Sequence, residues 1–363
     1  ATPAGNAKQR AGRESIPATG EEPMTVRTIL VATAGLLASG ALGPAAAAEL
    51  TVYTAIEADQ LKAYKEAFER DVPGVEIRWV RDSTGIVTAK LLAEKDNPQA
   101  DVVWGLAATS LMLLGEEGLL LPYAPKGIED IKPAYRDPAD PPTWVGMDVW
   151  SSAICFNTVE AEAKGLPRPS SWADLTDPVY KGQVAMPNPA SSGTGYLMVS
   201  AWLQLLGEEQ GWAFMDALHE NIAAYTHSGS KPCRQAGAGE YAIGISFEYR
   251  ASRTKSDGAP IDIILPSEGL GWDMEAAAII KTTSKLEAAQ KLMDWVISPA
   301  ANKLYAEGYA IVTLPGIAGE LAHIEGDIEA MLIDNDFVWA AANRERILAE
   351  WGKRYDGKSE PRS

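Results

Sequence analysis

Residues 184–203 read VAMPNPASSGTGYLMVSAWL, a short apolar run followed by small hydroxyl and glycine residues and then by a helical pattern. In such an arrangement, backbone N–H groups and the hydroxyls of Ser192 and Thr194 point at one spot, where the helix dipole adds positive potential. The simpler alternative is that Ser192 or Thr194 only caps the helix while the glycines form a turn. The segment therefore predicts a strand, a loop and a helix, with either an anion site or a plain helix start at the loop.

Two other segments repeat this pattern. Asp82-Ser83-Thr84-Gly85 precedes a helix predicted over residues 86–94, and His227-Ser228-Gly229-Ser230-Lys231 precedes one predicted over 233–238. Convergence of the three loops on one cleft would offer a tetrahedral phosphate or phosphonate several hydrogen-bond donors, and hydrogen bonds to an ionised group are the strong ones. The repetition favours the anion site over a plain helix cap.

The order of apolar runs indicates the fold class. Short runs rich in Val and Ile alternate with segments of helical period, which predicts an α/β protein built from βαβ units around mostly parallel sheets. The alternation breaks at Asp148-Val149-Trp150, and the chain turns again at Gly269–Asp273. We expect a crossing between two lobes at the first break and a return at the second.

Composition and the N-terminal residues narrow the class of protein. The chain has 363 residues, of which 46% are hydrophobic and 22% charged, as in a globular protein of two domains. Its net charge of −17 argues against nucleic acid or an anionic membrane as partner, because both require a basic surface. A basic start at Met24, an apolar run over residues 29–42 and an alanine-rich end predict a secretory signal peptide cleaved after Ala48.

Signatures of catalysis and of metal binding are missing from the sequence. It contains no CxxC pair, Cys/His cluster, G-x-S-x-G elbow or Walker loop, so we expect no enzyme, no metal site and no cofactor. Cys155 and Cys233 would meet an oxidising compartment after export. They can form a disulfide or remain free buried thiols, and the sequence leaves both alternatives open.

Acidic residues and aromatic residues occur together at predicted strand ends and in loops. The acidic ones are Glu57, Asp148, Glu248 and Asp273, and the aromatic ones include Tyr53, Trp104, Trp150, Tyr249 and Trp272. Each alone is as well explained by a surface charge or a core side chain. A carboxylate beside an aromatic ring, however, is what an ammonium group needs. Together with the anion loops, these residues predict a zwitterionic ligand.

Several stretches of this chain resemble the solute-binding proteins of bacterial ABC importers, in the group that binds ferric iron, thiamine and phosphonates. The likeness extends over nearly the whole chain after residue 48 and includes LTVYT (50–54), DVVW (101–104), AICFNT (153–158) and PSSWADL (169–175). Within the group, the chain is similar to 2-aminoethylphosphonate-binding proteins at DSTG (82–85), NPASSGTG (188–195), HSGSKPC (227–233) and FEYR (247–250).

This resemblance implies a periplasmic-binding-protein fold of type II, with two lobes of mixed sheets flanked by helices and two crossing strands as hinge. Residues 49–148 and 273–363 are expected to form lobe I, and residues 149–272 lobe II. It also implies a periplasmic receptor that closes on 2-aminoethylphosphonate and passes it to an inner-membrane ABC permease. We expect a monomer.

Candidate ligand residues follow from the loops and from the resemblance. The residues expected to hold the phosphonate are Ser83, Thr84, Gly85, Ser192, Gly193, Thr194, Ser228, Ser230 and Tyr249. Those expected to hold the amine or to form the wall are Tyr53, Glu57, Trp104 and Asp273.

The sequence leaves two alternatives open. A ferric-iron-binding protein, or a protein for another small phosphorylated or cationic solute, is the first. The iron-binding relatives use adjacent tyrosines, whereas Ser246-Phe247-Glu248-Tyr249-Arg250 has one tyrosine only. The second alternative is of another class, a secreted phosphonate or phosphoester hydrolase that uses His227.

Overall fold

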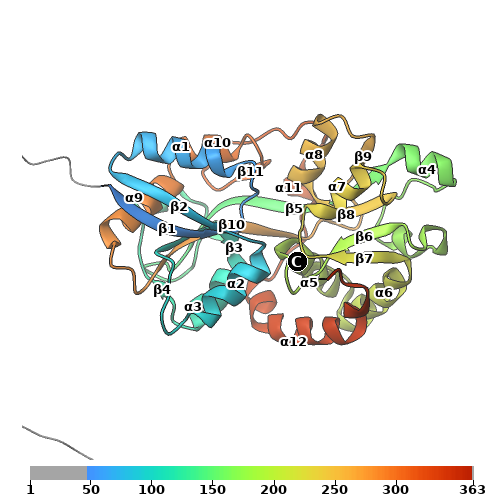
Figure 1. Ribbon diagram of the computed structural model, residues 1–363, viewed down its shortest axis with the longest axis horizontal. Helices are drawn as coiled ribbons and strands as arrows, with labels where there is room; N and C mark the ends of the chain where they lie inside the picture. The colour runs from blue at the N-terminus through green and yellow to red at the C-terminus, as the bar shows by residue number, and fades with distance from the viewer. Residues whose placement is uncertain (1–46, 362–363) are drawn as a thin grey trace, which may run out of the picture. The chain divides into compact units, whose positions relative to one another are not determined.

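The computed structural model describes residues 47–361 (Figure 1), so nearly all of the predicted signal peptide, residues 1–48, lies outside the described residues. Strands and helices alternate along the first part of the chain, as expected. The strands are β1 (Ala48–Thr54), β2 (Val75–Arg81), β3 (Val102–Ala107), β4 (Leu120–Leu121), β5 (Val145–Asn157), β6 (Val184–Pro187), β7 (Ile222–Thr226), β8 (Ile243–Phe247), β9 (Ile261–Ile264), β10 (Trp272–Ile280) and β11 (Ile311–Val312). The α-helices are α1 (Leu61–Asp71), α2 (Thr84–Ala93), α3 (Ala108–Glu116), α4 (Thr158–Lys164), α5 (Gly193–Leu206), α6 (Glu208–Asn221), α7 (Lys231–Gly237), α8 (Glu248–Ser256), α9 (Leu286–Val296), α10 (Pro299–Tyr305), α11 (Ile328–Met331) and α12 (Phe337–Tyr355).

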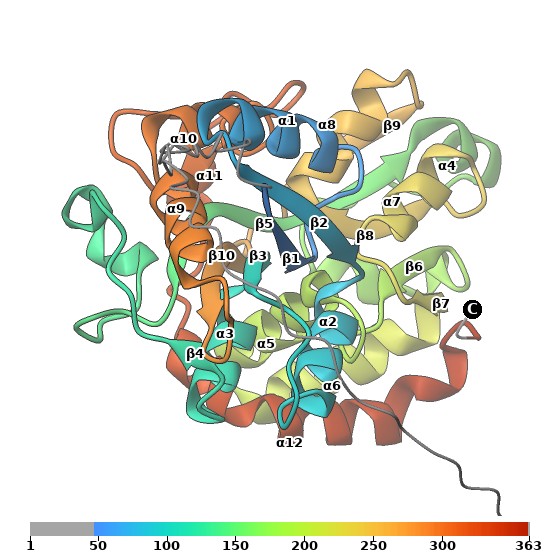
Figure 2. The ribbon, with the colours of Figure 1, turned by 60° about the vertical axis from the view of Figure 1, so that its left-hand side comes forward.

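A mixed sheet connects the two halves of the described chain, in the order β2-β1-β3-β10-β5-β8-β6-β7. The outer strands pair in parallel, β1 with β2 and β3, and β6 with β7 and β8, while β5 and β10 pair antiparallel in the middle. Helices lie on both faces (Figures 1 and 2). The predicted α/β class with mixed sheets is confirmed.

Strand β5 is the crossing expected near Trp150. It pairs with β10 up to Ser151 and with β8 from Ser152 onwards. The returning chain runs beside it, because Ser152 N donates to Gly271 O at 2.8 Å. The two crossing segments are thus adjacent.

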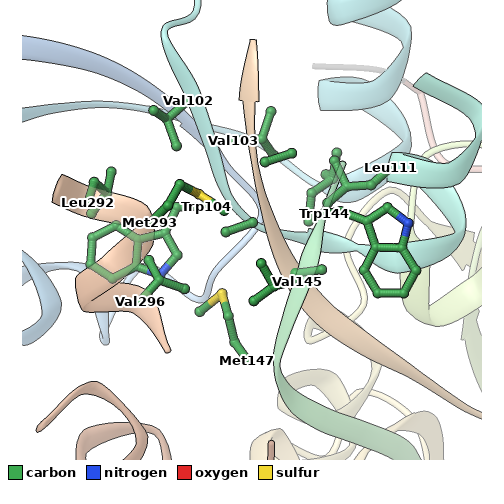
Figure 3. Packing of buried hydrophobic residues seen from close by; sticks show 14 of the residues in the cluster. Val102, Val103, Trp104, Leu111, Trp144, Val145, Met147, Leu292, Met293 and Val296 are labelled. Carbon is green, nitrogen blue, oxygen red and sulfur yellow. The ribbon is translucent and has the colours of Figure 1, made fainter. Parts of the chain in front are cut away.

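The first hydrophobic core, which we call core 1, packs against β1, β3 and the first part of β5. Trp104 is fully buried there, and Figure 3 shows it beside Leu292, Met293 and Val296 of α9. Its ring centroid is 5.6 Å from that of Trp295. Burying a large apolar side chain contributes about 1.5–3 kcal/mol, so the size of Trp104 accounts for its place in the core.

The second core, core 2, is built from β6, β7, β8, α5 and α6, and it includes part of the C-terminal helix. Ile347, Trp351 and Tyr355 of α12 belong to core 2, and the rings of Tyr225 and Trp351 lie 4.8 Å apart. We expected residues 273–363 to belong to lobe I, but α12 extends from α3 to the end of β7 (Figure 2). The sequence does not show which core covers the apolar side chains of α12.

None of the helices formed by residues 47–361 is long and apolar enough to span a membrane.

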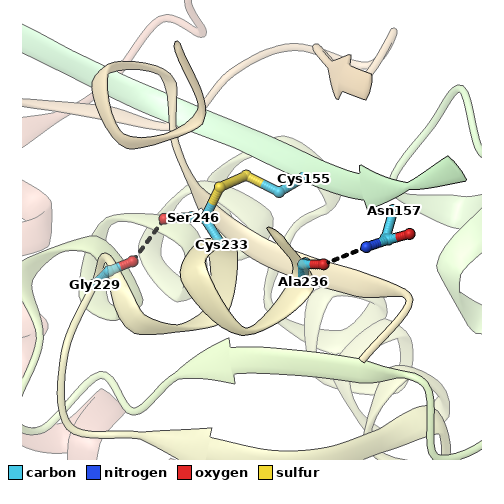
Figure 4. Close-up of a disulfide and its surroundings, with 6 residues drawn as sticks. All are labelled: Cys155, Asn157, Gly229, Cys233, Ala236 and Ser246. Atoms are coloured by element: carbon cyan, nitrogen blue, oxygen red, sulfur yellow. Dashed lines mark hydrogen bonds between the residues drawn. A yellow bond between two sulfur atoms is a disulfide. The ribbon is translucent and has the colours of Figure 1, made fainter. Parts of the chain in front are cut away.

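Cys155 of β5 and Cys233 of α7 are joined by a disulfide in the structure (Figure 4). Asn157 Nδ2 donates to Ala236 O at 2.7 Å on the same helix, so the end of β5 and α7 are fixed together by two links. The bond closes a loop of 78 residues.

Removing this disulfide should destabilise the protein. Closing a loop of this length restricts the unfolded chain and contributes about 2–4 kcal/mol. Urea unfolding of a Cys155→Ala/Cys233→Ala variant should show this loss, and reduced wild-type protein should show the same one. Equal stability of the oxidised wild type and the double variant would contradict the prediction.

Candidate functional site

A single small cavity lies where the three hydroxyl- and glycine-rich loops meet. The centres of water molecules can occupy about 40 Å³ of it, which corresponds to roughly three waters. The lining residues come from both halves of the sheet: Ala55, Glu57, Arg81, Ser83, Thr84, Gly105, Ala107, Trp150, Ser192, Gly193, Thr194, Ser228, Gly229, Phe247 and Glu275.

The first loop places Ser83 and Thr84 at the start of α2. Ser83 has extended backbone and stands as the N-cap residue. Its hydroxyl donates to His227 O at 3.0 Å and thereby contacts the third loop. Thr84, the first residue of the helix, carries an N–H group that has no intrahelical acceptor.

The second loop, at the start of α5, leaves two donors available. Ser192 is the N-cap, and its Oγ accepts a hydrogen bond from Gly195 N at 3.3 Å. The structure shows no acceptor for the N–H groups of Gly193 and Thr194 among residues 47–361. A Cβ on Gly193 would lie 2.6 Å from Thr84 Oγ1, so the first and second loops face each other at contact distance.

The third loop precedes α7. Ser228 Oγ and Ser230 Oγ lie 3.1 Å apart. Ser246 Oγ donates to Gly229 O at 2.7 Å (Figure 4), which fixes the loop to β8. A Cβ on Gly229 would lie 2.8 Å from Thr194 Cβ, so this loop contacts the second one. Ser230 is 1% exposed and does not line the cavity.

Gly85, expected among the phosphonate ligands, has a different place. Its N–H donates to Ser191 O at 3.0 Å, and it does not line the cavity. A Cβ here would overlap Ala190 O and come within 2.8 Å of Ser191 Cα. The residue must be glycine because two backbones meet at this point.

The aromatic residues divide between cavity and core. Trp150 and Phe247 line the cavity, whereas Trp104 is fully buried in core 1. Tyr53 Oη donates to Glu94 at 2.9 Å, away from the cavity. Tyr249 does not line it either, and stacks with Tyr309 at a centroid distance of 5.5 Å.

Two of the acidic residues expected near the amine are occupied by other partners. Glu57 lines the cavity, but its Oε2 accepts from Arg250 Nη2 at 2.6 Å and from Arg234 Nη2 at 3.2 Å. Asp273 caps α3 instead, accepting from Ala108 N at 3.1 Å and from the Thr109 hydroxyl at 2.6 Å. Burial raises the pKa of Asp273 to about 6.

Two charged cavity residues were missed by sequence reasoning, Arg81 at the end of β2 and Glu275 in β10. Arg81 Nε donates to Ile56 O at 3.1 Å, and its Nη2 lies 3.8 Å from Glu57 Oε1. Alternation along β10 puts Asp273 and Glu275 on the same face of the strand. The predicted residue, Asp273, therefore lies on the correct face, but Glu275 is the one that lines the cavity.

Glu275 is the acidic residue with free hydrogen-bonding capacity in the cavity. Tyr309 Oη donates to its Oε1 at a long 3.5 Å, and its buried Oε2 has no hydrogen-bond partner in the described part of the chain. Burial, together with the charge of Glu57, raises the pKa of Glu275 to about 8.

Two groups of parallel strands joined by crossing segments, with donor loops from both groups at one cavity, are typical of a solute-binding protein of the periplasmic type. The model of the family described as bacterial extracellular solute-binding protein matches residues 97–340, and the chain belongs to that family.

Two relatives match most of the chain. An uncharacterized protein of Haemophilus influenzae is 31% identical over 335 residues, covering 90% of this chain and 96% of its own. A probable ABC transporter periplasmic-binding protein of Sinorhizobium fredii is 28% identical and covers 82% of both chains.

A solved structure matches as well. The periplasmic binding protein AfuA of Actinobacillus pleuropneumoniae, solved with fructose 6-phosphate bound, superimposes with a TM-score of 0.80 at 30% identity, over 85% of this chain and 99% of its own. The protein is the periplasmic solute-binding component of an ABC transporter, and its homologues are binding proteins rather than enzymes.

Within residues 47–361 no three His, Cys, Asp or Glu side chains gather as a metal site would require. The acidic residues of the cavity face arginines and a tyrosine instead.

Replacing Gly85 by alanine should separate the two backbones that meet there. Overpacking of a closed contact costs about 1–3 kcal/mol, and the added methyl group can be accommodated only if the loops move apart. We expect a lower free energy of unfolding and a larger radius of gyration by small-angle X-ray scattering.

Gly115→Ala in α3 is the matched control, because the nearest atom to its added Cβ is 3.7 Å away. That variant should be neutral or gain up to about 1 kcal/mol from helix propensity. Identical scattering and stability of the Gly85 variant and wild type would refute the close contact.

Proposed function

We propose that the protein captures 2-aminoethylphosphonate between its lobes by hinge closure and delivers it to an inner-membrane ABC permease. The observation that carries the proposal is the meeting of three donor loops from both lobes at one small cavity, which also contains an acidic group without a strong partner. Such a cavity can bind a tetrahedral anion at the donor loops and an amine at the acidic group.

The anion end uses neutral donors. Gly193 and Thr194, whose N–H groups have no acceptor among residues 47–361, and the hydroxyl-bearing Thr84 and Ser228 line the cavity from three loops. Each hydrogen bond to an ionised group contributes about 1.5–3 kcal/mol. The helix N-termini add positive potential within a turn of the ligand, so the high negative charge of the protein does not prevent anion binding.

Arg81 adds a full positive charge to the cavity wall. Its guanidinium lies 3.8 Å from Glu57, which is already paired with Arg250, so part of its charge remains available to the anion. The resulting site is positive at the loops and acidic at Glu275, which suits a zwitterion.

The size of the cavity supports a small ligand. Room for roughly three waters suits a phosphonate with a two-carbon chain better than a hexose phosphate. A sugar phosphate is nevertheless the second candidate, because the relative AfuA, 30% identical, is described with fructose 6-phosphate bound. That ligand would need the lobes further apart than they are here.

Closure of the lobes is supported by direct contacts between them. Ser83 Oγ donates to His227 O, and Gly85 N donates to Ser191 O. A ligand that bonds to Thr84 on one side and Gly193 on the other adds to these contacts only in the closed form. Binding would therefore shift the population toward closure.

Calorimetry on the protein from residue 49 onwards tests the ligand. We expect binding of 2-aminoethylphosphonate, weaker binding of inorganic phosphate, and none of ferric citrate or putrescine. Fructose 6-phosphate bound more tightly than the phosphonate would favour the second candidate, and turnover of a phosphonate ester that is lost in His227→Ala would favour the hydrolase alternative.

Thr194→Val should weaken binding of every phosphonate about tenfold, because it removes one hydroxyl donor to the anion. Thr282→Val, at an exposed threonine outside the cavity, is the matched control and should bind like wild type. Unchanged affinity in the Thr194 variant would contradict the anion site at this loop.

A further inference from the structure

We propose that Glu275 determines specificity for the ligand's ammonium group, and that it binds this group as a carboxylate after releasing a proton that the pair Glu275–Asp148 holds in the empty site. The inference rests on the proposed function. It names the residue that binds the ammonium group and the charge state of that residue, and it adds the release of a proton to solvent.

Register places the two carboxyl groups together. Glu275 of β10 is paired with Asp148 of β5, so both side chains point to the same face of the sheet. The pairing slips by one residue directly after Glu275, at Met147 of β5. Such bulges re-aim side chains and are common beside functional sites.

Asp148 is a fully buried acid without compensation. It is 0% exposed, and neither of its carboxylate oxygens has a hydrogen-bond partner among residues 47–361. An ionised carboxylate in such a place costs several kcal/mol. Burial, followed by the charges of Glu275 and Glu248, raises its pKa well above the usual range.

The groups that surround the pair decide how many protons it holds. Tyrosine hydroxyls and acids outnumber cations on the elements packed against it. The tyrosines and acids are Tyr64 of α1, Glu248 and Tyr249 of α8, Tyr305 of α10, Tyr309 before β11 and Glu57 after β1, and the cation is Arg81 of β2. Two adjacent buried carboxylates in these surroundings do not both ionise near neutral pH, so the pair holds at least one proton.

Glu275 is better placed than Glu57 to receive an ammonium group. Glu57 already accepts from Arg250 and Arg234, whereas Glu275 Oε2 has no partner and its residue lines the cavity. An ammonium group at this oxygen would supply the missing partner and the missing positive charge. The carboxylate form is then favoured, and the proton goes to solvent.

The sign of the pH dependence follows from this proton. Below about pH 8 Glu275 holds its proton in the empty site, and the ligand must displace it. Affinity for 2-aminoethylphosphonate should therefore rise with pH toward 8, by up to about tenfold per pH unit relative to a variant that cannot ionise.

The experiment compares two ligands on two proteins. Glu275→Gln keeps the side-chain size and removes the charge, and ethylphosphonate keeps the anion and lacks the amine. We expect wild type to bind 2-aminoethylphosphonate at least about tenfold more tightly than Glu275→Gln does, and both proteins to bind ethylphosphonate within about threefold. Glu76→Gln, an exposed acid on β2, is the matched control and should behave like wild type.

Proton release gives a second readout that a purely structural role would not change. Calorimetry in two buffers of different ionisation enthalpy should show that wild type releases more protons than Glu275→Gln with the same 2-aminoethylphosphonate at pH 7. Asp148→Asn, which leaves Glu275 in place, should release fewer protons than wild type and still prefer the amine-bearing ligand. That variant serves as the test if Glu275→Gln does not fold.

Equal weakening of both ligands by Glu275→Gln, or equal proton release by wild type and the variants, overturns the inference and leaves the phosphonate proposal intact. Absence of binding of both phosphonates to wild type overturns the proposed function itself. Tighter binding of fructose 6-phosphate than of 2-aminoethylphosphonate by wild type overturns both.

Discussion

Strand β5 pairs with β10 as far as Ser151 and with β8 from Ser152 onwards, so one continuous strand belongs to both halves of the sheet. Every feature of the cavity depends on this pairing. It places the ends of the parallel strands of both halves near one another, and with them the loops that follow those strands. It also brings Glu275 beside Asp148. A shift of one residue in this register would put the two acids on opposite faces of the sheet.

Electrostatics at the cavity is local. A protein of net charge −17 offers an anion backbone N–H groups, hydroxyls and one guanidinium, all within a single cavity. Charges more than about 10 Å away are screened by salt, while the nearby dipoles are not. The carboxyl groups of Glu275 and Asp148 are buried. Burial both strengthens their interaction with a cation and favours their protonated forms.

Prediction from the sequence located cavity-lining residues where a side chain is tied to a local backbone motif. Ser83, Ser192 and Ser228 lie at loops before helices, and local sequence fixes that geometry. It failed at Trp104, because strand position and aromatic character do not distinguish a cavity wall from a core. Glu275 and Arg81 were missed because the partners that leave one acid free and occupy another come from distant parts of the chain.

By itself, the sequence determined the α/β class and the three loops at helix starts, because strand and helix periods and helix-start residues act over a few neighbouring positions. Only the tertiary structure decided that α12 covers core 2, that Gly85 marks a backbone contact, and that Asp273 caps a helix while Glu275 reaches the cavity. These outcomes depend on which distant backbones approach one another, and the pairing of β5 with β10 sets that approach.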